Sequence, residues 1–248
     1  FRGMYDNEVK KGLGHKDDNG AISLKNMTGE WEGIPFTADT VNVFNLTRPV
    51  LFCRFKSNFQ LDRLNSIMGQ QTFRFTAGSA NMNFVYKGGI NEDDTTHPYV
   101  NGSIEIKDGS VTYLPRSLSF VHTNATLYFT GDDLFLKNVR VQGRESVLFM
   151  EGSIKNFLNL YYAAPDKIVI DWKVRSPKIN LNEFRSFLGK RQYSVAPRVQ
   201  RNNHRKLNRL LRQLDVILDQ SNVNLNVAIN QLVYRKFEAS NINATVIL

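Results

Sequence analysis

The sequence predicts a mainly β fold: a large, twisted antiparallel sheet curled into an open groove or half-barrel, with a few short helices and one longer amphipathic helix. Three observations lead to this prediction. Apolar and polar residues alternate in many short segments, as in half-buried strands. Turn residues separate these segments at the spacing of an antiparallel meander. The helical segments are too few to cover one face of the roughly ten to twelve strands predicted.

The alternation is clearest in four segments, and shorter stretches follow the same rule. The four segments are 51–59, 80–87, 168–175 and 223–230, and the shorter stretches are 103–107, 125–130 and 242–247. Glycine-containing pairs between these segments predict turns. They are Gly88-Gly89, Asn101-Gly102, Asp108-Gly109 and Gly131-Asp132.

Helical periodicity interrupts the alternation in a few places. Short helices are predicted at 61–69, 154–163 and 179–188. A longer helix is predicted at 205–220, where apolar residues fall on a single stripe. That stripe consists of Leu207, Leu210, Leu211, Leu214, Ile217 and Leu218. We expect it to dock on the end or rim of the sheet, because an exposed stripe of this size would promote aggregation.

These patterns divide the chain into three parts. Residues 1–189 form the predicted antiparallel β groove domain, and residues 190–204 a basic linker or loop. Residues 205–248 supply the amphipathic helix and a strand pair that continues the same sheet. The chain starts with neither an initiator Met nor a signal peptide and ends inside a predicted strand, so we expect it to be a fragment of a longer protein. It contains no apolar run of about 18 residues or more, so no membrane-spanning segment is predicted.

The net charge of +9 comes from a single segment. Residues 185–212 hold nine Lys and Arg and no acidic residue, while the remaining Lys and Arg balance Asp and Glu at 23 each. The segment is interpreted as solvated surface, as a patch for anionic lipid headgroups that would use Arg198, Arg201 and Arg205, or as a nucleic-acid site. We expect no nucleic-acid partner, since Tyr193 alone offers an aromatic ring for stacking there.

Catalytic and metal-binding motifs are absent from the sequence. The four His residues lie far apart without metal-ligand spacing, and the single cysteine, Cys53, cannot form an intrachain disulfide. The acidic residues at 92–94 lack the spacing of a calcium loop and are expected in a solvated loop. We therefore expect no enzyme activity, no cofactor and no metal.

Apolar residues from separate strands share the two-residue period and are predicted to line one continuous surface. They are Phe55, Phe73, Phe75, Met82, Phe84, Ile104, Ile106, Leu127, Phe129, Ile168, Ile170 and Trp172. Cys53 has the parity of Leu51 and Phe55, so it is expected to be buried and unreactive.

Two motifs between residues 101 and 189 carry a resemblance to a known family. G-S-I-K-N-F-L at 152–158, combined with S-P-x-I-x-L-N-E-F at 176–184, resembles the C-terminal region of AsmA-like proteins, especially the Bacteroidetes type. The resemblance implies a periplasmic segment of a protein anchored in the inner membrane by a helix that this chain lacks. It also implies similarity to bridge-like lipid transfer proteins, whose sheets form open grooves, and a link to outer-membrane biogenesis and phospholipid traffic. The family has no catalytic motif to transfer.

Three functions remain open at the level of sequence. The first is a segment that binds or conducts phospholipid or another amphiphile in its apolar groove. The second is a structural scaffold that assists outer-membrane protein assembly through contacts with envelope proteins, with the apolar face sealed as a sandwich. The third is a polyanion-binding module that uses the basic segment. Alternation predicts an apolar face, but it does not show whether acyl chains or a second sheet covers that face.

Overall fold

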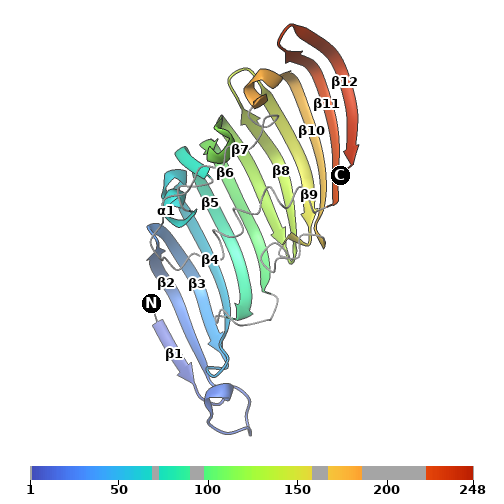
Figure 1. Ribbon diagram of the computed structural model, residues 1–248. Coiled ribbons are helices and arrows are strands. Elements are labelled where there is room, and N and C mark those ends of the chain that lie inside the picture. Colours follow the sequence, from blue (N-terminus) through green and yellow to red (C-terminus); the bar gives the residue numbers. More distant parts are fainter. Residues whose placement is uncertain (1, 69–72, 90–97, 158–166, 186–221, 248) are drawn as a thin grey trace.

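The computed structural model describes residues 2–68, 73–89, 98–157, 167–185 and 222–247. These residues form one open, twelve-stranded sheet in which the spatial order of the strands is their order in sequence (Figure 1). The predicted mainly β fold is therefore confirmed. The linker predicted at 190–204 and the helix predicted at 205–220 lie outside the described residues.

Except for the short β1, the strands are long, and the two edge strands lie at opposite ends of the sheet (Figure 1). Their bounds are β1 Arg2–Asp6, β2 Ala21–Trp31, β3 Ile34–Phe44, β4 Val50–Gln60, β5 Phe73–Gly89, β6 Tyr99–Tyr113, β7 Leu118–Thr130, β8 Asp133–Gln142, β9 Val147–Lys155, β10 Val169–Asn180, β11 Asn222–Tyr234 and β12 Phe237–Ile247. The strand pair β11 and β12 continues the sheet formed by the earlier strands.

The sheet departs from the predicted antiparallel arrangement at one pair. β10 and β11 run parallel, with Ile170 opposite Val223, whereas the other neighbouring strands are antiparallel. Parallel neighbours need a connection of about a dozen residues or more, and the segment between β10 and β11 is long enough. A sequence pattern that shows only which residues alternate does not give strand direction.

A second departure concerns the turns predicted within 99–113. β6 continues through Asn101-Gly102 and Asp108-Gly109, so neither pair is a turn. Instead, Asp108 has a left-handed backbone (φ 50°), and the pairing between β6 and its neighbours shifts on both sides of Gly109. These residues form a β-bulge, which inserts extra residues into one strand and increases its local twist.

Bulges recur in half of the strands. The register shifts at similar irregularities in β3, β5, β7, β8 and β10. Asn26, His122, Asn138 and Asn241 have left-handed backbones inside their strands. Each extra residue switches which side of the strand the following residues face. This is how odd-numbered Phe75 and even-numbered Met82 of β5 pack into the same apolar cluster.

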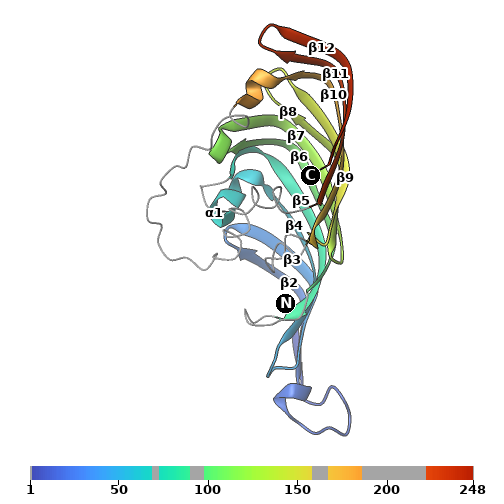
Figure 2. The ribbon, with the colours of Figure 1, turned by 45° about the vertical axis from the view of Figure 1, so that its right-hand side comes forward.

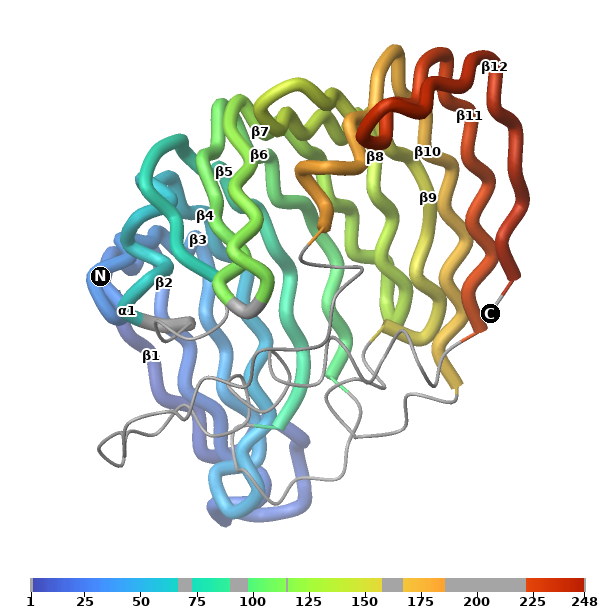
Figure 3. Tube along the Cα trace, turned by 45° about the horizontal axis from the view of Figure 1, so that its top comes forward, coloured from blue at the N-terminus to red at the C-terminus, as the bar shows by residue number. Residues whose placement is uncertain are grey.

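The bulges and strand twist account for the shape of the sheet. Figure 2 shows the sheet bowed, with α1 (Leu64–Met68) and the 3-10 turn at Leu181–Phe184 on its hollow side. Figure 3 shows the strands following one another around a curved wall. The described residues thus form an open, curved sheet with little helix on it.

The helical predictions have mixed outcomes. Residues 61–68 are helical as predicted, with a 3-10 turn at Leu61–Arg63 followed by α1. The helix predicted at 154–163 is wrong where it begins, because Ile154 and Lys155 lie in β9. The helix predicted at 179–188 begins only after β10 ends at Asn180, as the short 3-10 turn Leu181–Phe184.

The motif at 176–184 forms the end of β10 and this turn. Ser176 Oγ donates to the Val147 carbonyl (2.7 Å), and the bulge there accommodates Pro177, which has no N–H to offer the ladder. Asn180 caps the turn by accepting from the Asn182 amide at 3.0 Å. The Glu183 carboxylate accepts from the amides of residues 144 and 145 at 3.2 and 2.5 Å, respectively. The motif thus joins the end of β10 to the β8–β9 turn.

Candidate functional site: the apolar face of the sheet

Side chains at paired positions form apolar rows that cross the sheet on one face. One row runs from β3 to β11 through Ala38, Phe55, Phe84, Gly102, Phe129, Leu134, Ile154, Ile170 and Val223. The next row runs from β5 to β12 through Met82, Ile104, Leu127, Leu136, Gly152, Trp172, Leu225 and Val246. Both rows consist of apolar residues and glycine throughout.

Aromatic contacts link strands along the first row. The ring centroids of Phe55 and Phe84 lie 5.7 Å apart, and those of Phe84 and Phe129 lie 5.2 Å apart. Phe129 in turn lies 5.9 Å from Phe157, just beyond β9. These separations are in the range of favourable aromatic pairs. A chain of four rings therefore connects β4 with the end of β9.

Two buried clusters lie on this face, one toward each end of the described sheet. The first contains Ile34, Phe59, Leu61 and Ala80, with Leu64, Phe75, Met82, Ile104 and Ile106 packed against them. The second contains Ile168, Ile170 and Val223, with Ile154, Phe157, Trp172 and Leu225 packed against them. Phe157 belongs to the aromatic chain, so this chain reaches the second cluster.

All twelve residues predicted to line the surface lie in or beside these rows and clusters. Phe84, Ile168 and Ile170 are buried, while the other nine are half-buried. Phe73 contacts Phe75 of the first cluster, with ring centroids 6.4 Å apart. Leu127 lies between Ile104 and Leu136.

The predicted list omits several residues that belong to the same face. Leu134, Leu136, Ile154, Phe157 and Leu225 occupy the rows or clusters beside the predicted residues. Alternation at 134–136 and 223–229 could have found three of them. Ile154 falls in a segment with a helical pattern, and Phe157 follows the end of β9, so no two-residue period marks either residue.

The apolar face has little cover among the described residues. The 3-10 turn at Leu61–Arg63 and α1 pack on one end of this face. They do so through Leu61, which is 1% exposed, and Leu64. The second row, which runs from β5 to β12, remains half-buried at Met82, Ile104, Leu127, Leu136, Trp172 and Leu225. The described strands form one unclosed sheet, so no second sheet made of those strands packs against this face.

Cys53 lies in β4 between Val41 of β3 and Tyr86 of β5. Its side chain is half-buried, so the expectation of full burial is wrong. Desolvation by burial raises the pKa of the thiol, and a backbone hydrogen bond at Tyr86 offsets part of that rise. A raised pKa reduces the thiolate fraction at neutral pH and therefore the nucleophilicity of the thiol.

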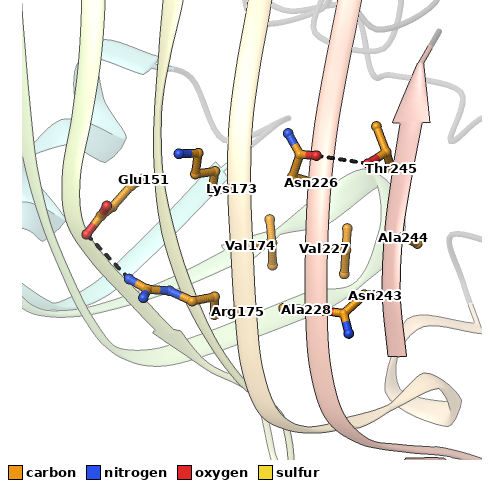
Figure 4. Close-up of a pocket in the computed structure, with 10 residues that line it drawn as sticks. All are labelled: Glu151, Lys173, Val174, Arg175, Asn226, Val227, Ala228, Asn243, Ala244 and Thr245. Carbon is orange, nitrogen blue, oxygen red and sulfur yellow. Dashed lines mark hydrogen bonds and ion pairs between the residues drawn. The ribbon is translucent and has the colours of Figure 1, made fainter. Parts of the chain in front are cut away.

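The opposite face of the sheet is more polar, although it includes Phe135 and Phe149, and it contains shallow depressions over β8 to β12. One depression, of about 510 Å³, is lined by side chains that include Glu151, Lys173, Asn226 and Thr245, which lie opposite one another across four strands (Figure 4). Thr245 donates to the Asn226 side chain at 2.9 Å. Glu151 and Arg175 form an exposed ion pair at 3.7 Å. This surface can hydrogen-bond to water or polar molecules, and it contrasts with the apolar face.

Other kinds of site find no support in the described part of the chain. There, no group of three or more His, Cys, Asp and Glu side chains gathers in a way that could hold a metal ion. In the same part, no helix has both the length and the apolar character to cross a membrane. The headgroup candidates Arg198, Arg201 and Arg205 lie outside the described residues.

Compared with protein-family models, with curated proteins and with solved structures, the chain matches none.

Proposed function

We propose that this chain binds phospholipid or a similar amphiphile along the apolar face of its sheet. We further propose that it is a periplasmic segment of an AsmA-like envelope protein, in which this face binds or conducts lipid without chemical change. In this proposal, the whole protein is anchored in the inner membrane and contacts other envelope proteins. The resemblance of residues 152–158 and 176–184 to the AsmA-like family supports it.

One observation carries the lipid-binding proposal: apolar rows continue across at least eight neighbouring strands on one face of an unclosed sheet. A curved, half-buried apolar surface can take up acyl chains, and it needs no specific chemistry to do so. Removing a chain of about sixteen carbons from water would contribute roughly 13 kcal/mol before the costs of binding, at about 0.8 kcal/mol per CH₂.

The rival scaffold function requires the apolar face to be sealed by another layer. The described strands supply no such layer, and the second apolar row, from Met82 to Leu225, is half-buried rather than buried. These two observations favour a lipid-binding surface over a sandwich. The sandwich predicts that the folded chain binds no lipid, which separates the two functions by experiment.

The test uses the 248-residue chain with pyrene-labelled phosphatidylcholine, and it compares neighbouring residues on opposite faces of one strand. Leu127→Asp places a carboxylate on the half-buried apolar face of β7, whereas Tyr128→Asp places it on the polar face, where Tyr128 is 40% exposed. We expect Leu127→Asp to weaken lipid binding at least about tenfold because the carboxylate must be desolvated among acyl chains. Tyr128→Asp should bind as well as the wild type.

A second pair of variants probes a distant strand. Leu225→Asp in β11 lies on the apolar face, and Asn226→Asp lies on the polar face beside it. Loss of binding in both apolar variants, with circular dichroism showing that they remain folded, is the expected result. If the folded wild-type chain binds no lipid, or if folded Leu127→Asp and Leu225→Asp bind like the wild type, the lipid-binding function is wrong and the scaffold function leads.

A further inference from the structure

The connection between β1 and β2, residues 7–20, projects past the ends of the neighbouring strands (Figures 1 and 2). One buried side chain shapes it. Asn19, which is 8% exposed, accepts from the Lys10 amide through Oδ1 at 2.9 Å. Its Nδ2 donates to the carbonyls of Lys10 and Gly14 at 3.1 and 2.9 Å, respectively. These three hydrogen bonds to one buried amide give residues 10–14 a defined conformation.

The base of this connection is fastened to the turn between β3 and β4. The Leu46 amide donates to the Asp17 carbonyl at 2.7 Å, and the Asn45 amide donates to the Gly20 carbonyl at 3.0 Å. Contacts with residues that follow the connection in the sequence therefore fix where it lies. A further strand beside β1 would pair along β1 and would leave residues 9–16 beyond the strand ends.

Residues 9–16, which we call the β1–β2 tip, combine apolar and basic side chains. Leu13 is 61% exposed and Val9 is 43% exposed. Gly12 and Gly14, on either side of Leu13, have left-handed backbones (φ 87° and 80°) and form the tight bend that presents it. The basic residues of the tip are exposed, and they are Lys10, Lys11 and Lys16. The acidic residues of the connection lie outside the tip, and they are Glu8, Asp17 and Asp18.

We propose that the β1–β2 tip docks on an anionic membrane surface. Leu13 and Val9 enter the boundary between headgroups and acyl chains, and the three lysines contact headgroup phosphates. Apolar side chains flanked by lysines bind this boundary because they gain both apolar burial and attraction to anionic lipid.

A membrane suits this tip better than a protein partner does. A stable protein interface buries about 800 Å² on each partner, which a narrow projecting loop does not offer. A bilayer surface yields to a projecting side chain, so it needs no matching concavity. This docking concerns the surface of a bilayer rather than the uptake of single lipids by the apolar face. It therefore does not depend on the proposed function.

Local fluorescence tests the docking in the 248-residue chain. An NBD label is attached at Leu13→Cys in a Cys53→Ser background, and vesicles of phosphatidylcholine and phosphatidylglycerol in equal parts are added. We expect the NBD emission to rise and shift to the blue, and a doxyl group near the headgroups to quench it. Pure phosphatidylcholine vesicles should bind at least about fivefold more weakly. A control label at Lys236→Cys, in the exposed β11–β12 turn at the far end of the sheet, should stay in water (Figure 1).

Paired charge reversals test the lysines. Lys10→Glu with Lys11→Glu should weaken binding of the labelled tip to the anionic vesicles at least about tenfold. Lys25→Glu with Lys173→Glu changes the net charge equally at exposed positions outside the tip, so binding should be unchanged.

Circular dichroism verifies that all variants fold. A Leu13 label that stays in water overturns the proposal, as does equal binding to the two kinds of vesicle. Equal effects of the two charge reversals, or equal responses of the labels at Leu13 and Lys236, also overturn it.

Discussion

Gly102 allows two aromatic rings to meet across a strand. It lies in β6 between Phe84 of β5 and Phe129 of β7, whose ring centroids are 5.2 Å apart. A Cβ atom at this position would lie 2.1 Å from the Asn83 carbonyl oxygen and 2.8 Å from the Phe84 ring. Its φ of +151° also disfavours residues with a side chain. The apolar face is continuous here because this residue lacks a side chain.

Gly102→Ala should therefore lower the free energy of unfolding by about 2 kcal/mol or more, because the added methyl group overpacks the site and strains the backbone. Urea unfolding measures the loss. Gly131→Ala is the control: its φ is +63°, but no atom lies within 4 Å of the added Cβ. The control should lose about 1 kcal/mol from backbone strain alone. Equal losses in the two variants would show that packing against the rings contributes nothing.

Cys53 offers a test of burial by pH. Because the folded-state pKa is raised, its stabilising contribution is present below the unfolded-state pKa and is lost as pH rises through the folded-state pKa. We expect iodoacetamide to alkylate the native thiol more slowly than the urea-unfolded thiol near neutral pH, with the midpoint of the rate–pH profile shifted upward in the native protein. Coincident profiles for the native and unfolded chain would contradict this account of the Cys53 environment.

At the scale of elements, the β8 bulge keeps both halves of one strand facing the same side. Leu136 lies opposite Gly152 and Val139 lies opposite Met150, so two residues of β8 face one residue of β9. Asn138, with φ 52°, is the left-handed residue of this bulge. Asn tolerates that conformation better than most residues with a side chain. The bulge leaves Leu134 and Val139, of opposite parity, both buried.

Replacement of Asn138 tests the bulge. Asn138→Val should lower the free energy of unfolding by about 1–2 kcal/mol, because a β-branched residue is strained at positive φ. Asn138→Gly should be nearly neutral. Lys155→Val, at an exposed and extended position in β9, should cost little and serves as the control. Thermal or urea unfolding compares the three variants. If the Asn138→Val variant were as stable as the Asn138→Gly variant, the left-handed backbone would be dispensable.

At the scale of the whole molecule, apolar burial and charge are separated along the chain. The rows that carry the proposed lipid site lie in the described sheet, whereas the cationic excess lies in residues 185–212. The proposed binding energy comes from acyl chains, and apolar burial is insensitive to ionic screening. Charge should contribute only where a lipid headgroup is itself charged.

Salt dependence separates these contributions. Binding of phosphatidylcholine should be nearly unchanged between about 0.1 and 1 M salt, although the Debye length falls from about 10 to 3 Å. Binding of anionic phosphatidylglycerol should weaken modestly over the same range of salt. The double variant Arg201→Glu with Arg205→Glu should remove this salt dependence of phosphatidylglycerol binding. Fluorescence titration with both lipids measures it. A large loss of phosphatidylcholine binding in high salt would mean that charge, rather than the apolar face, holds the lipid.

The sequence by itself determined the class of fold and much of the apolar face. Two-residue alternation requires one face of each strand to differ from the other, because successive side chains point to opposite sides. It therefore identified residues such as Met82, Ile104 and Leu127 as neighbours on one surface before any strand pairing was known. It also predicted a short helix at 61–69, where residues 61–68 are helical.

Only the tertiary structure decided strand direction, the bulges and the two edges. Alternation carries no information about direction, so the parallel pairing of β10 with β11 was not foreseen. A bulge breaks the period locally, so Asp108-Gly109 resembled a turn until the pairing of β5, β6 and β7 showed otherwise. Edges are defined by which strands lack a neighbour, and this depends on pairings between residues distant in sequence. The exposed apolar end at Val246 is a property of the assembled sheet.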